Sequence, residues 1–260
     1  MSKLELMKGD CLERMKEIPD GSIDLILTDP PYGTTQCKWD SVIPFEPMWA
    51  ELKRVIKPNG AIVLFGAEPF SSMLRVSNLK MYKYDWVWEK SRALGFMNAK
   101  NKPMNKHELA SVFSSGTCAN GSSKKMPYYP QGLIPLNKIV KGRKDSLADR
   151  VGHKFSRKSH KDEIFQEWTN YPDQILRYAS EGNTVHPTQK PVALLEYLIK
   201  TYTLENETVL DFTAGSMSTA IACINTNRNG IMIEKDEHYF KVGSDRVAQA
   251  LQERGNSNLC

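Results

Sequence analysis

Four short hydrophobic runs, separated by segments with helical spacing, constrain the fold of this chain more than any other feature. The runs are IDLILT (23–28), AIVLFG (61–66), ETVLD (207–211) and NGIMIE (229–234). Nearly continuous apolar runs of this length suit strands that are buried on both faces of a sheet. Strands that alternate with helices favour parallel pairing, because the helices cross the faces of the sheet between strands. We therefore predict an α/β fold with a doubly wound, mostly parallel sheet.

Two segments between these runs have the pattern expected of covering helices. The segment 45–60 places apolar residues on one helical face and ends at Pro58-Asn59-Gly60, a helix-stopping sequence. The segment 190–203 is amphipathic and has Pro191 in its first turn, where proline is favourable.

The composition is typical of a soluble globular protein, with 40% hydrophobic and 25% charged residues. No apolar run is long enough to span a membrane, and the first ten residues lack the hydrophobic core of a signal peptide. We expect a cytoplasmic protein with no membrane partner. The five cysteines are far apart and form no C-x-x-C pair, so we expect neither a disulfide framework nor a metal site.

The composition of the sequence changes between Gly116 and Gly182, where glycine, serine, proline and charged residues are frequent and the helical and strand patterns are lost. Residues 117–183 contain 12 Lys or Arg and 7 Asp or Glu, so 12 − 7 = +5, which equals the net charge of the whole chain. We predict one domain formed by residues 1–115 and 183–260, with an insertion at 116–182. A solvated insertion is the ordinary interpretation, but basic residues interleaved with tyrosine and tryptophan also suit contact with nucleic acid.

The stretch TDPPYG (28–33) follows the first hydrophobic run directly. Two consecutive prolines cannot lie inside a helix or a paired strand, because each lacks a donor and has a fixed φ. The stretch is therefore either a stiff turn that ends an element or a rigid cup that holds something flat and polar.

Two further motifs indicate a ligand at the carboxyl edge of the sheet. In VLDFTAGSMSTA (209–220), a strand ends at Asp211 and a turn with Gly215 and Ser216 leads into a helix. Ligands bind at this edge in doubly wound sheets, and helix N-termini favour negative groups. Glu234 ends the next strand, where such folds hydrogen-bond ribose hydroxyls. Together the motifs suggest a nucleoside-bearing cofactor; an ordinary crossover with an exposed Glu is the alternative.

DLILTDPPYG near the N-terminus and DFTAGS near the C-terminus resemble the motifs of S-adenosylmethionine-dependent DNA amino-methyltransferases. The order of the motifs is similar to the permuted group called β. MKGDCLERM (7–15) matches a turn whose acid reaches the cofactor adenine, and HPTQKPVALLEYLI (186–199) matches the segment beside the methionine end. The resemblance covers residues 4–115 and 183–248. It implies a Rossmann-like sheet of seven strands, circularly permuted in motif order, with an inserted target-recognition region.

The resemblance also implies a reaction in duplex DNA. The target base is flipped out of the helix, and the Asp29 carboxylate and Pro30 carbonyl accept hydrogen bonds from its exocyclic amine. Pro31 helps to hold that carbonyl in place, and Tyr32 offers a stacking face. Asp at the first motif position goes mostly with adenine N6, which favours adenine; cytosine N4 and an RNA base are the alternatives.

The same resemblance predicts the residues of the cofactor site and suggests DNA contacts in the insertion. The predicted cofactor residues are Asp10, Cys11, Phe65, His186, Thr188, Lys190, Asp211, Thr213, Gly215, Ser216 and Glu234. The DNA-binding candidates are Lys124, Lys125, Lys141, Arg143, Lys144, Arg157 and Lys158. Double-stranded DNA is the expected partner; a homodimer and a companion restriction enzyme are compatible with the resemblance but leave no signal in the sequence. We expect Trp86 and Trp88 to lie in the core, and core packing is an equal alternative for Phe65.

Met217 departs from the family pattern, which has a second glycine at this position of the cofactor turn. If the position needs a positive φ or a close backbone approach, methionine is costly there. Either the turn accepts methionine or the affinity for the cofactor is reduced. A DNA-binding protein with a degenerate cofactor site is therefore the alternative to an enzyme.

Overall fold

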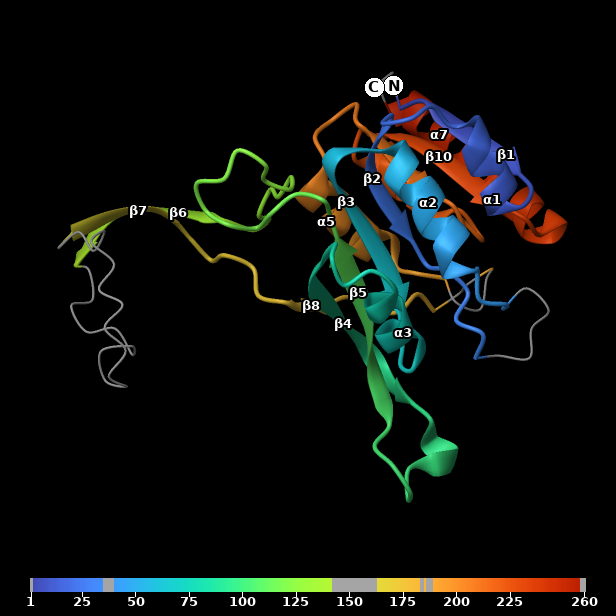
Figure 1. Ribbon diagram of the computed structural model, residues 1–260, viewed down its shortest axis with the longest axis horizontal. Coiled ribbons are helices and arrows are strands. Elements are labelled where there is room, and N and C mark those ends of the chain that lie inside the picture. The colour runs from blue at the N-terminus through green and yellow to red at the C-terminus, as the bar shows by residue number, and fades with distance from the viewer. Residues whose placement is uncertain (1, 35–39, 142–162, 183–184, 186–188, 258–260) are drawn as a thin grey trace. The chain divides into compact units, whose positions relative to one another are not determined.

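The computed structural model describes residues 2–34, 40–141, 163–182, 185 and 189–257 (Figure 1). The chain divides into two compact units, Met1–Tyr129 with Gln174–Cys260, and Pro130–Asp173. The second unit contains an antiparallel pair, β6 (Ile134–Lys141) and β7 (Glu163–Thr169). No helix among the described residues has the length and hydropathy needed to cross a membrane.

The first unit is built on one eight-stranded sheet in the order β1-β10-β9-β2-β3-β5-β4-β8. Its strands are β1 (Leu4–Lys8), β2 (Ile23–Thr28), β3 (Ile56–Gly66), β4 (Tyr82–Leu94), β5 (Asn105–Phe113), β8 (Ile175–Arg177), β9 (Thr208–Asp211) and β10 (Asn229–Glu234). All neighbours are parallel except β5, which is antiparallel to both β3 and β4. The predicted doubly wound, mostly parallel sheet is confirmed. The expected count of seven strands is wrong: the sheet has eight, and its edge strand β8 is only three residues long, too short to show a sequence pattern.

Helices cover both faces of this sheet (Figure 1). One face carries α1 (Cys11–Arg14), the short 3-10 turn η1 (Met15–Glu17), α2 (Phe45–Val55) and α3 (Phe70–Ser77); the other carries α5 (Val192–Tyr202), α6 (Ser218–Asn225) and α7 (Glu237–Ser257). In β2, Leu25 and Leu27 belong to the core cluster of α5 and α6, whereas Ile23 and Ile26 belong to that of α2. Burial on both faces explains why the run IDLILT is so hydrophobic.

The helix predicted over 45–60 ends earlier than its pattern indicated. Helix α2 stops at Val55, and β3 begins at Ile56. The pairing of β3 with β2 shifts register between Ile23 and Leu25, and Asn59 has a φ of 64°. The intervening KPNG sequence is therefore a bulge inside a strand, a feature that a helix-stop pattern does not distinguish from a turn.

Strands β2 and β9 lie side by side in the middle of the sheet and mark its switch point. The chain continues from β2 to β3 on one side and from β9 to β10 on the other. Connections that leave neighbouring strands in opposite directions open a crevice at their carboxyl ends. Both sequence motifs, TDPPYG after β2 and DFTAGS after β9, therefore meet at this crevice.

Candidate active site

A pocket of about 560 Å³ occupies this crevice. Its wall contains every described residue predicted to be catalytic or cofactor-binding: Asp10, Cys11, Asp29, Pro30, Pro31, Tyr32, Phe65, Lys190, Asp211, Thr213, Gly215, Ser216 and Glu234. His186 and Thr188 lie outside the described residues. The roles assigned to these side chains stay predictions, but segments far apart in the sequence share one cavity.

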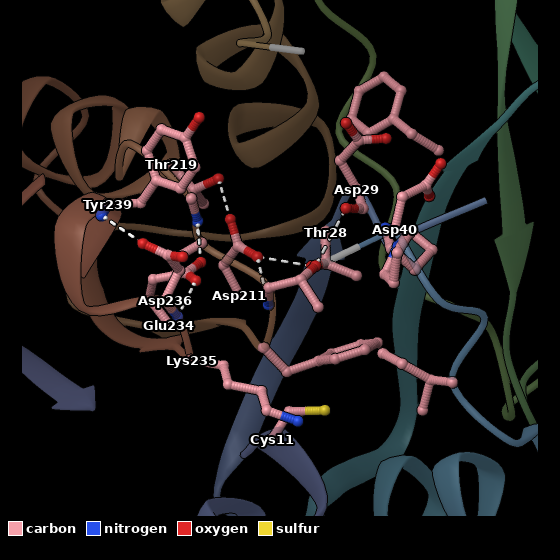
Figure 2. Close-up of a pocket in the computed structure, with 18 of the residues that line it drawn as sticks. Cys11, Thr28, Asp29, Asp40, Asp211, Thr219, Glu234, Lys235, Asp236 and Tyr239 are labelled. Atoms are coloured by element: carbon pink, nitrogen blue, oxygen red, sulfur yellow. Dashed lines mark hydrogen bonds between the residues drawn. The ribbon is translucent and has the colours of Figure 1, made fainter. Parts of the chain in front are cut away.

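The wall of the pocket is strongly acidic. It carries seven carboxylates and two lysines: Asp10, Asp29, Asp40, Asp211, Glu234, Asp236 and Glu237, with Lys190 and Lys235. In Figure 2, Asp29 and Asp40 lie to one side of Asp211, and Glu234 and Asp236 lie to the other. Like charges repel, so this wall disfavours a polyphosphate and favours a ligand with positive charge.

Hydroxyl groups join the end of β2 to the turn after β9 (Figure 2). The Thr28 hydroxyl donates to Asp211 at 2.5 Å and lies 2.6 Å from the Thr213 hydroxyl. The Thr213 hydroxyl in turn donates to the Asp29 carbonyl at 3.1 Å, and Thr219 donates to Asp211 at 2.6 Å. Burial raises the pKa of Asp211 to about 6, although these hydroxyl donors oppose the shift. The backbone of Asp29 is thereby held against the cofactor turn.

Glu234 is fixed by the backbone of the neighbouring turns. Its carboxylate accepts the Gly215 N–H and the Asp236 N–H, each at 2.7 Å. Gly215 has a φ of 51°, a conformation that favours glycine. Burial raises the pKa of Glu234. A carboxylate has about four lone-pair sites, so Glu234 keeps capacity to accept hydrogen bonds from a ligand.

Asp29 belongs to a chain of alternating charges. Its carboxylate pairs with the ammonium of Lys190 and accepts a hydrogen bond from the Tyr32 hydroxyl. Lys190, only 6% exposed, also pairs with Glu108 at 3.1 Å, and Glu108 pairs with Lys90. The Lys190 ammonium lies 5.1 Å from the centre of the Phe65 ring. The cavity therefore holds its catalytic candidate, which is half-buried, in contact with a buried ion-paired lysine.

The pKa values in this cluster follow from burial and the paired charges. Burial raises the pKa of Asp29, and the positive charge of Lys190 opposes that shift. For Lys190, burial favours the neutral amine, but Asp29 and Glu108 outweigh it and raise the pKa. Lys190 therefore stays charged, and its charge favours an ionised Asp29.

The turn that carries Tyr32 is held on two sides. One face of the ring stacks on Phe70, with ring centres 5.0 Å apart and planes 25° from parallel. The Asp40 carboxylate accepts the N–H groups of Gly33 at 2.8 Å and Thr34 at 3.0 Å. Tyr32 also lines the pocket, so a flat ligand can meet a ring that is already supported from behind.

The sequence patterns do not single out several residues of this site. Glu108 lies inside an unremarkable strand pattern, and Asp40 and Asp236 lie in loops. Only its place along the strand could have indicated Glu108: it lies just before the buried part of β5, at the sheet edge where β3 ends. Lys190 is predicted beside the cofactor, but its direct partner is Asp29.

The other predicted residues are distributed as follows. Trp86 and Trp88 are buried in the core as predicted, and Phe65 is both buried and part of the pocket wall. Lys124 and Lys125 are exposed in the first unit, and Lys141 is exposed in the second. The remaining DNA-binding candidates lie outside the described residues: Arg143, Lys144, Arg157 and Lys158.

Met217 takes a left-handed conformation, with a φ of 60°, at the N-terminus of α6. Its side chain is fully buried and packs against Gly243 of α7, where an added Cβ would lie 2.6 Å from the Met217 Cγ. Neighbours 214, 215, 216, 218 and 219 line the pocket, but Met217 does not. Methionine at this position therefore strains the backbone, but its side chain fills space in the core and does not enter the pocket.

Met217→Gly should lower stability without weakening the binding of S-adenosylmethionine. Relief of the left-handed strain gains about 1–2 kcal/mol, but loss of a buried methionine side chain costs about 2–5 kcal/mol. We expect a lower free energy of unfolding in urea and an unchanged dissociation constant by calorimetry. Gly243→Ala should destabilise the wild type more than the Met217→Gly variant. Tighter binding by Met217→Gly would instead mean that the methionine impairs the cofactor site.

Comparisons with known proteins show which family this chain resembles. The family model described as DNA methylase matches residues 23–245. The type II methyltransferase M.HpaI of Haemophilus parainfluenzae is 27% identical over 93% of this chain and 73% of the relative. The DNA adenine methyltransferase YhdJ of Escherichia coli (strain K12) is 26% identical over 93% of this chain and 82% of the relative.

Solved structures share the fold. The M1.HpyAVI complex with SAM is 24% identical, covering 94% of this chain and 99% of that chain, with a TM-score of 0.60. The cytosine-N4-specific PvuII DNA methyltransferase is 16% identical, covering 96% and 92%, with a TM-score of 0.64. Because the matched family segment runs from β2 into α7 and so includes both strands that form the pocket, this chain belongs to the DNA methylase family.

Proposed function

We propose that this protein is a site-specific DNA methyltransferase that transfers a methyl group from S-adenosylmethionine to the N6 of adenine. One observation carries the proposal: the half-buried Asp29 and the half-buried Glu234 lie at different parts of the same pocket, at the carboxyl ends of strands on either side of the switch point. The first suits a base amine, and the second suits a ribose. The name of YhdJ, an adenine methyltransferase, supports adenine as the base.

The pocket fits the methyl donor. S-adenosylmethionine supplies an electrophilic methyl group on a positively charged sulfonium. The seven carboxylates outnumber the two lysines of the wall, so the cavity stabilises positive charge, and a volume of about 560 Å³ suits a small nucleoside ligand. Glu234 would accept the ribose hydroxyls, Asp10 would face the adenine, and the turn at Gly215 and Ser216 would meet the methionine end.

Asp29 acts on the target amine in this proposal. A flipped adenine stacks on the free face of Tyr32, and the Asp29 carboxylate and Pro30 carbonyl accept its N–H groups. These acceptors localise the nitrogen lone pair and stabilise the positive charge that develops on nitrogen. As the new N–C bond forms, the bond between the methyl carbon and the donor sulfur breaks, its electron pair stays on sulfur, and the donor leaves as a neutral thioether. Asp29 takes the proton that the nitrogen loses. Lys190 and Tyr32 keep the carboxylate in position throughout.

Mass spectrometry of nucleosides tests the reaction directly. DNA treated with the purified protein and S-adenosylmethionine should contain N6-methyladenine, and DNA treated without the donor should not. N4-methylcytosine in the same assay would move the assignment to cytosine, and modified nucleosides in treated RNA alone would move it to RNA. Absence of donor binding at millimolar concentration would leave the chain as a DNA-binding protein with a degenerate site.

The remaining parts of the proposal concern recognition and assembly. The insertion 116–182 has a net charge of +5, equal to that of the whole chain, and reads the target sequence. Sequencing that maps modified bases in DNA from expressing cells identifies that sequence. We extend the proposal to a homodimer, which light scattering tests. We also extend it to a companion restriction enzyme, which digestion of unmodified and modified DNA by lysate of the source cells tests.

A further inference from the structure

The hairpin formed by β4 and β5 extends past the carboxyl edge of the sheet. Gly66, the last residue of β3, pairs with Leu109, which also pairs with Val87. Beyond that level β4 continues to Leu94, seven residues further, which corresponds to about 20 Å at the rise of a strand. Figure 1 shows this hairpin projecting away from the layers of helices. It points from the same sheet edge at which the pocket opens.

The base of the hairpin is part of the active site. Glu108 is next to Leu109, the last residue of β5 that pairs with β3, and lies on the side of the hairpin tip. It pairs with Lys190, which pairs with Asp29. Lys90 on β4 pairs with Glu108 across the hairpin. The tip is therefore connected to Asp29 through paired strands and through ion pairs at the base of the hairpin.

The tip is folded and presents apolar side chains to solvent. Gly95, with a φ of 95°, leads into the 3-10 turn η2 (Phe96–Asn98), and the Asn98 N–H donates to the Gly95 carbonyl at 3.0 Å. The Asn98 carbonyl then accepts from Asn101 at 2.9 Å. Phe96 is 82% exposed and Met97 is 96% exposed. An ordered turn that holds two large apolar residues in water indicates a surface that a partner covers.

The hairpin is also positively charged along its length. Residues 90–107 contain five Lys or Arg and no Asp or Glu. Lys90 and Lys106 pair with Glu108 and Glu89. The other three, Arg92, Lys100 and Lys102, have no ion pair among the residues described in the structure and are exposed. A polyanion complements this surface, whereas a second copy of the same basic tip would be repelled.

We propose that the β4–β5 hairpin is a DNA-contacting arm, with Phe96 and Met97 inserted beside the target base pair and Arg92, Lys100 and Lys102 on phosphates. The proposal rests on the proposed function, because it takes duplex DNA as the substrate. Phenylalanine and methionine are among the residues that wedge between base steps. A two-stranded ribbon also fits the major groove, which is about 12 Å wide. A wedge next to the target base lowers the cost of flipping it toward Asp29.

Two variants separate the contribution of the apolar tip from that of the basic residues, and a third variant is their control. The wedge variant is Phe96→Ser with Met97→Ser, and the charge variant is Arg92→Gln, Lys100→Gln and Lys102→Gln. The control, Val76→Ser with Leu79→Ser, removes two exposed apolar side chains at the end of α3. Binding is measured by fluorescence anisotropy of a labelled duplex with the mapped target site, without methyl donor. Genomic DNA fragments replace that duplex if no site is mapped.

We expect the charge variant to bind at least tenfold more weakly. Its log–log salt dependence should be shallower by about 0.9 for each phosphate that the protein no longer neutralises. The wedge variant should keep the wild-type salt slope but methylate a paired target at least tenfold more slowly. It should recover on a duplex whose target base is mismatched, because a mismatched base is easier to flip. The control variant should behave as wild type.

Wild-type DNA binding and methylation by both hairpin variants would overturn the proposal. An equal defect of the wedge variant on paired and mismatched targets would refute insertion. Binding of S-adenosylmethionine, measured on the same proteins, distinguishes these failures from failure of the proposed function. A chain that binds DNA through the hairpin but forms no methylated base refutes the methyltransferase assignment and leaves the arm standing.

Discussion

Asp29→Ala should reduce the single-turnover methylation rate by at least about 10³-fold, within the range for loss of a general base and of charge stabilisation. The Asp29 carboxylate is proposed to accept a hydrogen bond and then the proton from the target amine. The variant removes this carboxylate and leaves the turn that holds Glu234 unchanged. The dissociation constant for S-adenosylmethionine should therefore stay close to that of the wild type. A single-turnover assay with labelled donor, together with calorimetry, provides both readouts.

The alanine variant also leaves Lys190 with Glu108 as its remaining partner among the described residues, so its folding needs a check. Asp29→Asn is the matched control, because asparagine keeps the shape and one acceptor for Lys190. We expect Asp29→Asn to melt close to wild type and still to lack activity. Measurable turnover by both variants would contradict the role given to Asp29.

Lys190→Met should make methylation depend on higher pH. Burial and Glu108 raise the pKa of Asp29, and Lys190 opposes them. Without the ammonium, Asp29 becomes protonated at higher pH and loses its capacity as an acceptor. The acidic limb of the pH–rate profile should therefore move upward by about 1–3 units, the usual effect of one close opposite charge. At pH values below the new limb, turnover should be lost.

Two controls separate this effect from a general loss of structure. Lys190→Arg keeps the positive charge and should restore the limb toward its wild-type position. Lys235→Met removes the other lysine of the pocket wall, which pairs with Asp10 and is mostly exposed, and should leave the limb in place. A Lys190→Met profile with the same acidic limb as wild type would show that Lys190 does not set the ionisation of Asp29.

The sheet and the place of the pocket could be predicted from the sequence because both depend on short-range patterns. Runs such as IDLILT are hydrophobic since both faces of β2 are covered, and ligands gather where neighbouring strands end at a switch point. The family resemblance then supplied identities for Asp29, Asp211 and Glu234. The DNA methylase match confirms that resemblance, while the individual roles remain to be measured.

The pairing of Lys190 with Asp29 could not be predicted in the same way. It joins residues 161 positions apart, and Glu108 enters only because antiparallel β5 returns the chain to the edge of the pocket. Such contacts depend on strand register, which a one-residue slip would change completely. The sequence raised a positive φ at Met217 as one possibility, but it could not show where the side chain packs, because the space for it is made by a glycine in a different helix.

The hydroxyl contacts between Thr28, Asp211 and Thr213 have a consequence for how such a chain can evolve. These contacts require β2 and β9 to be neighbours in space, and they do not depend on which of the two strands comes first in the sequence. A gene rearrangement that moves the start of the protein from one loop to another keeps these contacts, provided that the cut avoids the two strands. The chemistry of the site therefore does not depend on the order in which its motifs are encoded. Proteins with different motif orders can form the same catalytic centre.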